Sequence, residues 1–382
     1  MKNLTLEKKQ KEIYPDYLCD EDGCLILLPE PYPVPCQSTY DKALEDSLAY
    51  SNERRENYEN FLKSSKRCVE PNYLPIRIDI ENVSRCNFAC QMCMVSTWDK
   101  RQRARDLEFK EFKEIIDNQV GLVEVKIQGF GEPTMQRDVF YEMIKYARMK
   151  ELWVRTVTNA SLLHLKDNYK KLIDSGVNEI QISIDGATKE VFESIRHGSV
   201  FDMVVSNCKL INEYAASKGV ELTKMWTVVQ RKNQHQIKEL IDLGKEIGFK
   251  HLVFSLNLVD FGVEEIKQRN ASESIMETVT NRDALKYIEY GDSLGLNVRF
   301  WRQTGKYSTK SPDKLCPWPF ERAFISSDSR IVPCCVIGNP EVADFGSATE
   351  LSEIWNSKVY KDFRNRHLSG DIPSMCKDCY CE

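Results

Sequence analysis

The stretch Pro75-Ile-Arg-Ile-Asp-Ile-Glu-Asn-Val-Ser-Arg-Cys-Asn-Phe-Ala-Cys-Gln-Met-Cys-Met94 decides the fold class of this 382-residue chain. Its first six residues alternate in character, which predicts a β-strand over residues 75–80. Three cysteines, Cys86, Cys90 and Cys93, follow in a loop with C-x3-C-x2-C spacing. Because α/β barrels carry their chemistry in loops at the carboxyl ends of strands, this order predicts an α/β fold with a reactive site in the loop.

Three cysteines this close together can hold three irons of a four-iron cluster and leave the fourth iron open. An open iron can bind and activate a small molecule, whereas a fully ligated cluster carries electrons or supports structure. A zinc site and ordinary core cysteines are the alternatives. Zinc usually takes four ligands, often as two C-x2-C pairs, and no histidine stands nearby, so the spacing favours a cluster.

Strand and helix patterns alternate from residue 75 to about residue 300. Strands are expected over residues 75–80, 123–127, 152–157, 179–184, 221–229 and 251–256. Amphipathic helix patterns such as 107–116 lie between them, and this alternation predicts a parallel sheet with right-handed crossovers. Six units are too few to close an eight-stranded barrel, so we expect a partial, three-quarter β/α barrel.

The cysteine loop and the motifs that follow it resemble the signature of the radical S-adenosylmethionine (SAM) superfamily. The resemblance implies the three-quarter barrel and a [4Fe-4S] cluster whose open iron binds the amino and carboxylate groups of SAM. It also implies reductive cleavage of SAM to methionine and a 5′-deoxyadenosyl radical. Met92 takes the place of the family's usual aromatic residue near the adenine.

Further SAM contacts are expected at the ends of the predicted strands. Gly129, Gly131, Glu132 and Pro133, within Gln128-Gly-Phe-Gly-Glu-Pro-Thr134, resemble the family motif that holds the SAM amino group. By the same resemblance, Asn159, Ser183 and Asp185 lie near the carboxylate and ribose of SAM. Arg196 could pair with the SAM carboxylate, and Gln230 could contact SAM or substrate. The ordinary alternatives are a turn for the glycine motif, a helix cap after Ser183 and a solvated helix end for Arg196.

A second group of cysteines lies near the end of the chain. Cys316, Cys334, Cys376 and Cys379 could close one auxiliary cluster, although a single C-x2-C pair with two distant cysteines also suits zinc. The surrounding Cys316-Pro-Trp-Pro-Phe320, Val332-Pro-Cys-Cys335 and Trp355-Asn-Ser357 resemble the SPASM/twitch appendage of radical SAM enzymes. The shortened set of cysteines resembles that of the 2-deoxy-scyllo-inosamine dehydrogenase group, which implies one auxiliary [4Fe-4S] cluster.

Two cysteines, Cys335 and Cys381, remain outside this ligand set. Either could be an ordinary thiol, or could donate a hydrogen atom to a substrate radical, as in radical SAM epimerases. Cys381 could also replace Cys379 as the fourth auxiliary ligand.

Composition sets the broad class of the protein. The net charge of −5 gives no indication of nucleic acid or an anionic membrane as a partner. No apolar signal region or membrane span is visible, and fourteen cysteines in such a chain favour reduced thiols in the cytoplasm. We expect an N-terminal helical and Pro-rich extension over 1–72 (helices 4–13 and 38–66), a radical SAM core over 73–302 and an auxiliary domain over 303–382.

These features together predict an oxidoreductase that removes a hydrogen atom from its substrate. We expect dehydrogenation of a small molecule, namely a sugar, nucleotide sugar or cyclitol, with a reducing partner such as flavodoxin or ferredoxin. The alternatives are a radical epimerase of such a substrate, a peptide-modifying maturase, and a non-catalytic iron–sulfur electron carrier.

Overall fold

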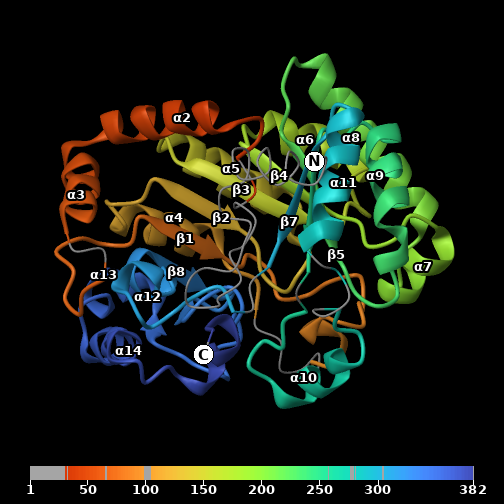
Figure 1. The fold of residues 1–382 in the computed structure, drawn as a ribbon. Coiled ribbons are helices and arrows are strands. Elements are labelled where there is room, and N and C mark those ends of the chain that lie inside the picture. The colour runs from red at the N-terminus through yellow and green to blue at the C-terminus, as the bar shows by residue number, and fades with distance from the viewer. Residues whose placement is uncertain are drawn as a thin grey trace, which may run out of the picture.

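The computed structural model describes residues 31, 33–64, 67–98, 105–256, 258–275, 279, 281–302 and 305–381. These residues build one sheet of ten strands in the order β10-β9-β8-β1-β2-β3-β4-β5-β6-β7 (Figure 1). Its parallel part consists of β1 (Arg77–Ile80), β2 (Glu124–Ile127), β3 (Trp153–Thr158), β4 (Glu179–Ser183), β5 (Thr223–Val228), β6 (His251–Ser255) and β7 (Asn297–Trp301). The sheet curves but does not close, as a partial barrel requires.

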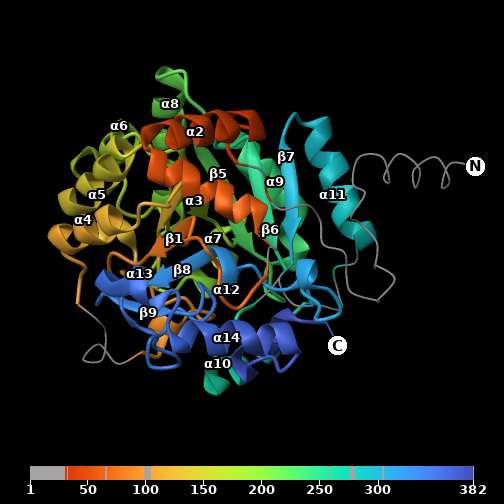
Figure 2. The ribbon, with the colours of Figure 1, turned by 90° about the vertical axis from the view of Figure 1, so that its left-hand side faces the viewer.

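Helices cover the outer face of the parallel strands (Figures 1 and 2). They are α4 (Phe109–Asn118), α5 (Asp138–Met149), α6 (Asn168–Asp174), α7 (Lys189–Ile195), α8 (Phe201–Ser217), α9 (Ile237–Glu246) and α11 (Asn281–Ser293). Apolar strand residues such as Ile78, Val125 and Ile180 face these helices and form the main core. The alternating residues turn polar side chains toward the inside of the barrel, because successive strand residues point to opposite faces.

The six predicted strands match β1 to β6 closely at their ends. The sequence prediction missed β7, whose five residues include the polar Asn297 and Arg299 and lack a long apolar run. It also missed that β8 (Arg322–Ile325) pairs in parallel with β1. The barrel sheet therefore continues directly into the C-terminal domain.

The C-terminal domain adds α12 (Trp318–Glu321), β9 (Arg330–Val332), β10 (Gly346–Ser347), α13 (Leu351–Ile354) and α14 (Lys358–Ser369). Trp355 is fully buried, and its indole N–H donates to the Tyr73 carbonyl at 2.9 Å. The guanidinium of buried Arg364 lies 4.3 Å from the Trp355 ring and donates to the carbonyl of Pro319. These contacts hold the domain against the chain that leads into β1.

The N-terminal extension supplies α2 (Gln37–Tyr50) and α3 (Asn52–Lys63). The helix predicted over 38–66 is interrupted at Ser51, whose hydroxyl accepts from the Arg54 amide and caps α3. The predicted helix 4–13 lies outside the described residues. Short 3-10 turns occur at Met94–Ser96, Pro133–Gln136, Leu165–Asp167, Gln234–Gln236, Pro312–Lys314, Ala348–Glu350 and Ser374–Cys379. Within the described chain, every helix is too short or too polar to cross a membrane.

Candidate active site

The first cysteine loop follows β1 and is fixed by backbone hydrogen bonds. The amide of Ala89 donates to the carbonyl of His197 at 2.8 Å, and the amide of Gln91 donates to the carbonyl of Ile195 at 3.1 Å. Both bonds tie the loop to the end of α7. Three thiols of this loop line a single cavity of about 240 Å³: Cys86, Cys90 and Cys93.

These thiols have the properties of cluster ligands. Burial raises the pKa of Cys86 and of Cys90 to about 12. Deprotonating these thiols therefore costs free energy, which a bound metal centre would offset by binding the thiolates. Among the residues that the structure describes, no three Cys, His, Asp or Glu side chains converge closely enough to hold a single metal ion. A four-iron cluster needs no such convergence, because each iron takes its own thiolate. Three thiols on one cavity wall therefore fit the predicted cluster.

Eight of the ten residues predicted to contact SAM line the same cavity, which places them beside the cysteines. They are Met92, Gly129, Gly131, Glu132, Pro133, Asn159, Ser183 and Arg196. The other two, Asp185 and Gln230, are buried but do not line it. Their predicted contact with SAM stays a prediction that the cavity does not favour.

The two glycines of the loop after β2 allow a close approach of backbone segments. A Cβ atom at Gly131 would lie 2.1 Å from the carbonyl oxygen of Val83, and one at Gly129 would lie 2.2 Å from Cγ of Glu81. Only glycine fits such contacts. The loop therefore packs directly on the chain that follows β1, and this packing sets one wall of the cavity.

Glu132 is buried, and its carboxylate accepts four hydrogen bonds from the protein. Oε1 accepts from the amide and hydroxyl of Thr134 at 3.2 and 2.6 Å and from the hydroxyl of Thr158 at 2.7 Å. Oε2 accepts from the amide of Asn159 at 2.7 Å. Burial raises the pKa of Glu132. Glu132 thus joins the loop after β2 to the end of β3, and its predicted contact with the SAM amino group would be made in addition.

Arg196 and Asp185 form a buried ion pair at 2.8 Å beside the cysteine loop. Asp185 also accepts from the amide of Val228 at 2.7 Å, and Nη1 of Arg196 lies 4.0 Å from the sulfur of Cys90. Asp185 therefore positions Arg196, and the guanidinium is the member of the pair that faces the cavity. A buried charge in this place requires its partner.

Sequence reasoning missed the contribution of α10 (Glu264–Ala271) to the cysteine loop. Arg269 donates to the carbonyl of Cys93 at 3.1 Å and to the hydroxyl of Ser96, also at 3.1 Å. Phe261, just before this helix, packs edge-on against Phe130 with ring centres 5.1 Å apart, and both rings line the cavity. No local signal in the sequence relates these residues to a loop so far away in the chain.

Three C-terminal cysteines, Cys316, Cys334 and Cys335, pack against a small apolar cluster formed by Trp318, Phe324 and Val332. Burial and then the charges of neighbouring cysteines raise the pKa of Cys334 and of Cys316. Five thiols lie close enough for the charge of one to raise the pKa of another. They are the four predicted auxiliary ligands, Cys316, Cys334, Cys376 and Cys379, together with Cys335. Their gathering fits an auxiliary cluster, and the choice of ligands among them stays a prediction.

A hydrogen-bonded chain supports this second site. The amide of Cys316 donates to the hydroxyl oxygen of Tyr380 at 3.0 Å, and that hydroxyl lies 2.7 Å from Nδ1 of His367. Burial lowers the pKa of His367 to about 4. His367 is therefore neutral in the folded protein and can accept the Tyr380 proton.

The two remaining cysteines differ in environment. Cys335 lines a second, larger cavity of about 440 Å³ inside the barrel. Cys381 is disulfide-bonded in the structure, with its sulfur 3.2 Å from the Tyr307 carbonyl oxygen. The roles predicted for Cys381, a hydrogen-atom donor or a replacement for Cys379 as cluster ligand, both require this bond to be reduced, and they stay predictions. Cys335 is the one of the two with access to the barrel interior.

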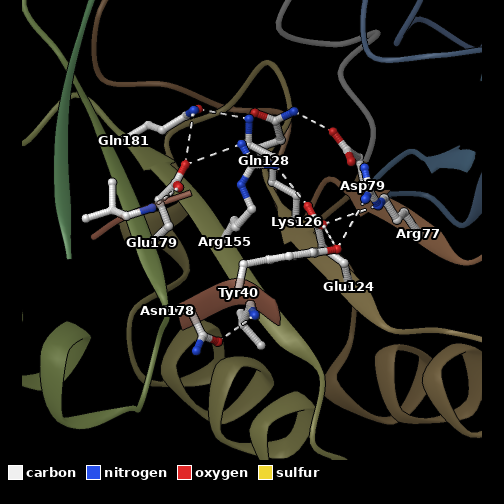
Figure 3. Close-up of polar contacts among 12 residues, drawn as sticks. Tyr40, Arg77, Asp79, Glu124, Lys126, Gln128, Arg155, Asn178, Glu179 and Gln181 are labelled. Carbon is white, nitrogen blue, oxygen red and sulfur yellow. Dashed lines mark hydrogen bonds and ion pairs between the residues drawn. The ribbon is translucent and has the colours of Figure 1, made fainter. Parts of the chain in front are cut away.

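A layer of charged side chains closes the bottom of the larger cavity (Figure 3). Glu124 pairs with Arg155 at 2.9 Å and with Arg77 at 3.4 Å, and Glu179 pairs with Arg155 at 3.3 Å. The hydroxyl of Tyr40, from α2, donates to Glu124 at 3.3 Å. The N-terminal extension thus seals the end of the barrel opposite the cysteine loop.

Comparison with protein families agrees with both cysteine sites. The radical SAM superfamily matches residues 83–244, and an iron–sulfur cluster-binding domain, SPASM, matches residues 316–380. The mycofactocin maturase MftC of Mycolicibacterium smegmatis is 33% identical over 178 residues, which cover 46% of this chain and 43% of MftC. The match to this relative therefore spans less than half of its length.

Two further relatives match more of the chain. The tungsten-containing aldehyde ferredoxin oxidoreductase cofactor-modifying protein of Pyrococcus furiosus is 25% identical over 325 residues, covering 78% of this chain and 86% of the relative. The structure of Streptococcus suis SuiB bound to precursor peptide SuiA superposes with a TM-score of 0.59 at 18% identity, covering 85% of this chain and 73% of SuiB. SuiB has also been solved with SAM.

The likeness to SuiB shows the fold, a radical SAM partial barrel followed by a cysteine-rich domain. The two family matches give the cofactors: SAM, a [4Fe-4S] cluster and an auxiliary iron–sulfur cluster. The first cysteine loop lies within the radical SAM match and the C-terminal cysteines lie within the SPASM match, and their roles as ligands stay predictions. The chain therefore contains a radical SAM domain joined to a SPASM iron–sulfur cluster-binding domain.

Proposed function

We propose that this enzyme modifies a peptide, oxidising one of its residues after removal of a hydrogen atom. Two relatives support a peptide over the small polyhydroxylated substrate that we first expected. One is a maturase, MftC, and the other, SuiB, was solved with a precursor peptide. The chain aligns with less than half of MftC, so the relationship supports the class of substrate and leaves the modified residue open.

One observation carries the oxidative part of the proposal: the first cysteine loop and Cys335, the neighbour of the predicted auxiliary ligand Cys334, line two adjoining cavities. The smaller cavity holds the thiols of the first loop, and the larger one reaches Cys335. The two cavities share eight lining residues: Gln128, Gly129, Phe130, Val157, Ser183, Val228, Val259 and Phe261. A substrate that occupies both cavities can reach the first cysteine loop and Cys335.

Different residues of the chain would hold the two clusters and SAM. Cys86, Cys90 and Cys93 would hold the first cluster, which together with SAM supplies the radical that removes the hydrogen atom. Arg196, the cationic member of a buried ion pair at this cavity, is placed to receive an anionic group such as the SAM carboxylate. The C-terminal thiols would hold the auxiliary cluster, which supplies an electron acceptor.

The test uses anaerobically reconstituted enzyme with SAM, dithionite and synthetic peptides encoded beside its gene. We expect 5′-deoxyadenosine and a peptide that is lighter by about two hydrogen masses. Cys90→Ala should abolish both products. The proposal fails if 5′-deoxyadenosine forms, every such peptide stays unmodified, and a sugar or cyclitol is oxidised instead.

A small polyhydroxylated substrate is the second candidate, and the polar interior of the barrel favours it. Asp79, Gln128 and Gln181 line the larger cavity with hydrogen-bonding groups suited to hydroxyls. Epimerisation of such a substrate would use Cys335 as hydrogen-atom donor. In heavy water, epimerisation would add one deuterium without loss of mass, whereas dehydrogenation would remove about two hydrogen masses.

A reducing partner and a location complete the proposal. A reducing protein such as flavodoxin or ferredoxin would deliver the electron for SAM cleavage, and the enzyme would work in the cytoplasm, where thiols stay reduced. Replacing dithionite by reduced flavodoxin should sustain 5′-deoxyadenosine formation. Absence of product with every physiological reductant tested would contradict the choice of partner.

A further inference from the structure

The larger cavity carries an excess of positive charge. Four cationic side chains line it, against only two carboxylates among the described lining residues. The cations are Arg77, Lys126, Arg155 and Arg322, and the carboxylates are Asp79 and Glu124. Like charges at close range in a poorly solvated space repel one another. Glu179, behind the lining residues, balances part of this excess through Arg155.

The lower layer of the cavity is already balanced by ion pairs. Glu124 and Glu179 bracket Arg155, and Glu124 also reaches Arg77 (Figure 3). Glu179 further pairs with Lys224 at 3.0 Å. These side chains come from the first residues of their strands, or close to them, at the end of the barrel that α2 covers. They form a structural floor and leave little capacity for a ligand.

Two further cations, Lys126 and Arg322, are not balanced in the same way. Arg322 lies in register with Arg77, and Lys126 lies two residues further along β2 than Glu124. Nζ of Lys126 donates to the neutral amide oxygen of Gln181 at 2.9 Å. Arg322 lies with its guanidinium 5.8 Å from the Trp318 ring, and its buried Nε has no hydrogen-bond partner. Among the described residues, neither cation has a carboxylate within ion-pair distance.

The same two cations flank one region of the cavity. Lys126 is on β2 and Arg322 on β8, the strands on either side of β1, and both charges act on Asp79 of β1 and on Cys335. Asp79 itself is engaged by Gln128, whose amide donates to it at 2.6 Å. The region belongs to the cavity that also reaches Cys335 and that adjoins the cavity of the first cysteine loop.

We propose that Lys126 and Arg322 form a carboxylate-binding subsite that holds an acidic side chain or terminal carboxylate of the substrate. A guanidinium and an ammonium from the two strands that flank β1 can share the two oxygens of one carboxylate. A dianionic phosphate would place more negative charge beside Asp79, so the geometry favours a monoanion. The inference rests on the proposed function in that the substrate is taken to be a peptide.

Competitive labelling of Lys126 tests the subsite without turnover. Burial and the neighbouring Arg155 lower the pKa of Lys126 to about 8, so acetic anhydride should acetylate it at mildly alkaline pH. Reconstituted, SAM-loaded enzyme is labelled with N-acetylglutamate methylamide, with its glutamine counterpart or with inorganic phosphate present. Mass spectrometry then reports acetylation of Lys126, with the exposed Lys42 as internal reference.

We expect the glutamate compound to protect Lys126 and the glutamine compound not to. Arg322→Gln should weaken protection about tenfold, the loss of one charged hydrogen bond, whereas Arg322→Lys should retain most of it. Arg55→Gln, at an exposed position of α3, is the matched control. Circular dichroism of the Arg322 variants verifies that they are folded.

Equal protection by the glutamate and glutamine compounds would overturn the subsite, as would unchanged protection in Arg322→Gln. Stronger protection by phosphate than by the glutamate compound would overturn the choice of a carboxylate. Because the readout is binding, its failure is distinct from a failure of the peptide proposal. Protection without any modified peptide would leave the subsite in place for another acidic substrate.

Discussion

Replacing Glu132 by Gln tests how the site is positioned. The two carboxylate oxygens accept amides from opposite sides, Thr134 on Oε1 and Asn159 on Oε2. A glutamine side chain has one acceptor oxygen, so in either orientation one of these buried N–H groups faces an NH2 group. Leaving a buried donor without an acceptor costs about 1–3 kcal/mol.

A second effect reduces this loss. The raised pKa of Glu132 means that burial of its charge already costs free energy, and the neutral amide removes that cost. We therefore expect the free energy of unfolding to fall by about 1–2 kcal/mol. Since the lost bond orders either the loop after β2 or the end of β3, SAM should also bind more weakly.

Urea denaturation of the reconstituted protein and calorimetric titration with SAM measure the two effects. Glu190→Gln, at an exposed position of α7, is the matched control and should leave both unchanged. The reasoning would be refuted by a Glu132→Gln protein with wild-type stability and wild-type SAM affinity.

Three further outcomes are expected. Reconstituted wild-type protein should contain about eight irons, and about four after alanine replacement of the first-loop cysteines; four irons in the intact protein would remove the auxiliary cluster. Because the pKa of folded His367 is about 4 and that of an ordinary histidine 6.5, stability should be lost as pH falls through this window, and His367→Gln should flatten the slope of a denaturation series; an unchanged slope would place the proton uptake elsewhere. Trp355→Ala should cost about 3–5 kcal/mol by opening a cavity in the core, and a melting temperature equal to that of the wild type would show that the C-terminal domain does not depend on this contact.

Local patterns were sufficient for much of the fold. The strands β1 to β6 alternate in a way that marks them individually, and the first cysteine loop and the motif around Glu132 follow strand ends. Asn159 and Ser183 were predicted from the family resemblance, and parallel strands bring their carboxyl ends, and with them these residues, to one edge of the sheet. That geometry explains why most predicted SAM contacts line one cavity.

The remaining features depend on contacts that no local pattern contains. The direction of the Asp185 side chain follows from Arg196, which comes from the end of another element. The support of Cys93 by Arg269 joins residues far apart in the chain. The inward charges at Arg77, Glu124 and Lys126 did alternate visibly with apolar residues, but their partners follow from strand register, which a single strand does not reveal.

Formation of 5′-deoxyadenosine tests the central claim most directly. Reconstituted enzyme is incubated with SAM and dithionite, and the product is compared in wild type, Cys90→Ala and Cys36→Ala, the last at an exposed cysteine outside both sites. The account predicts product from the wild type and from Cys36→Ala, and none from Cys90→Ala, which should keep its auxiliary iron. Equal product from Cys90→Ala and the wild type, or no product from any of the three, would contradict it.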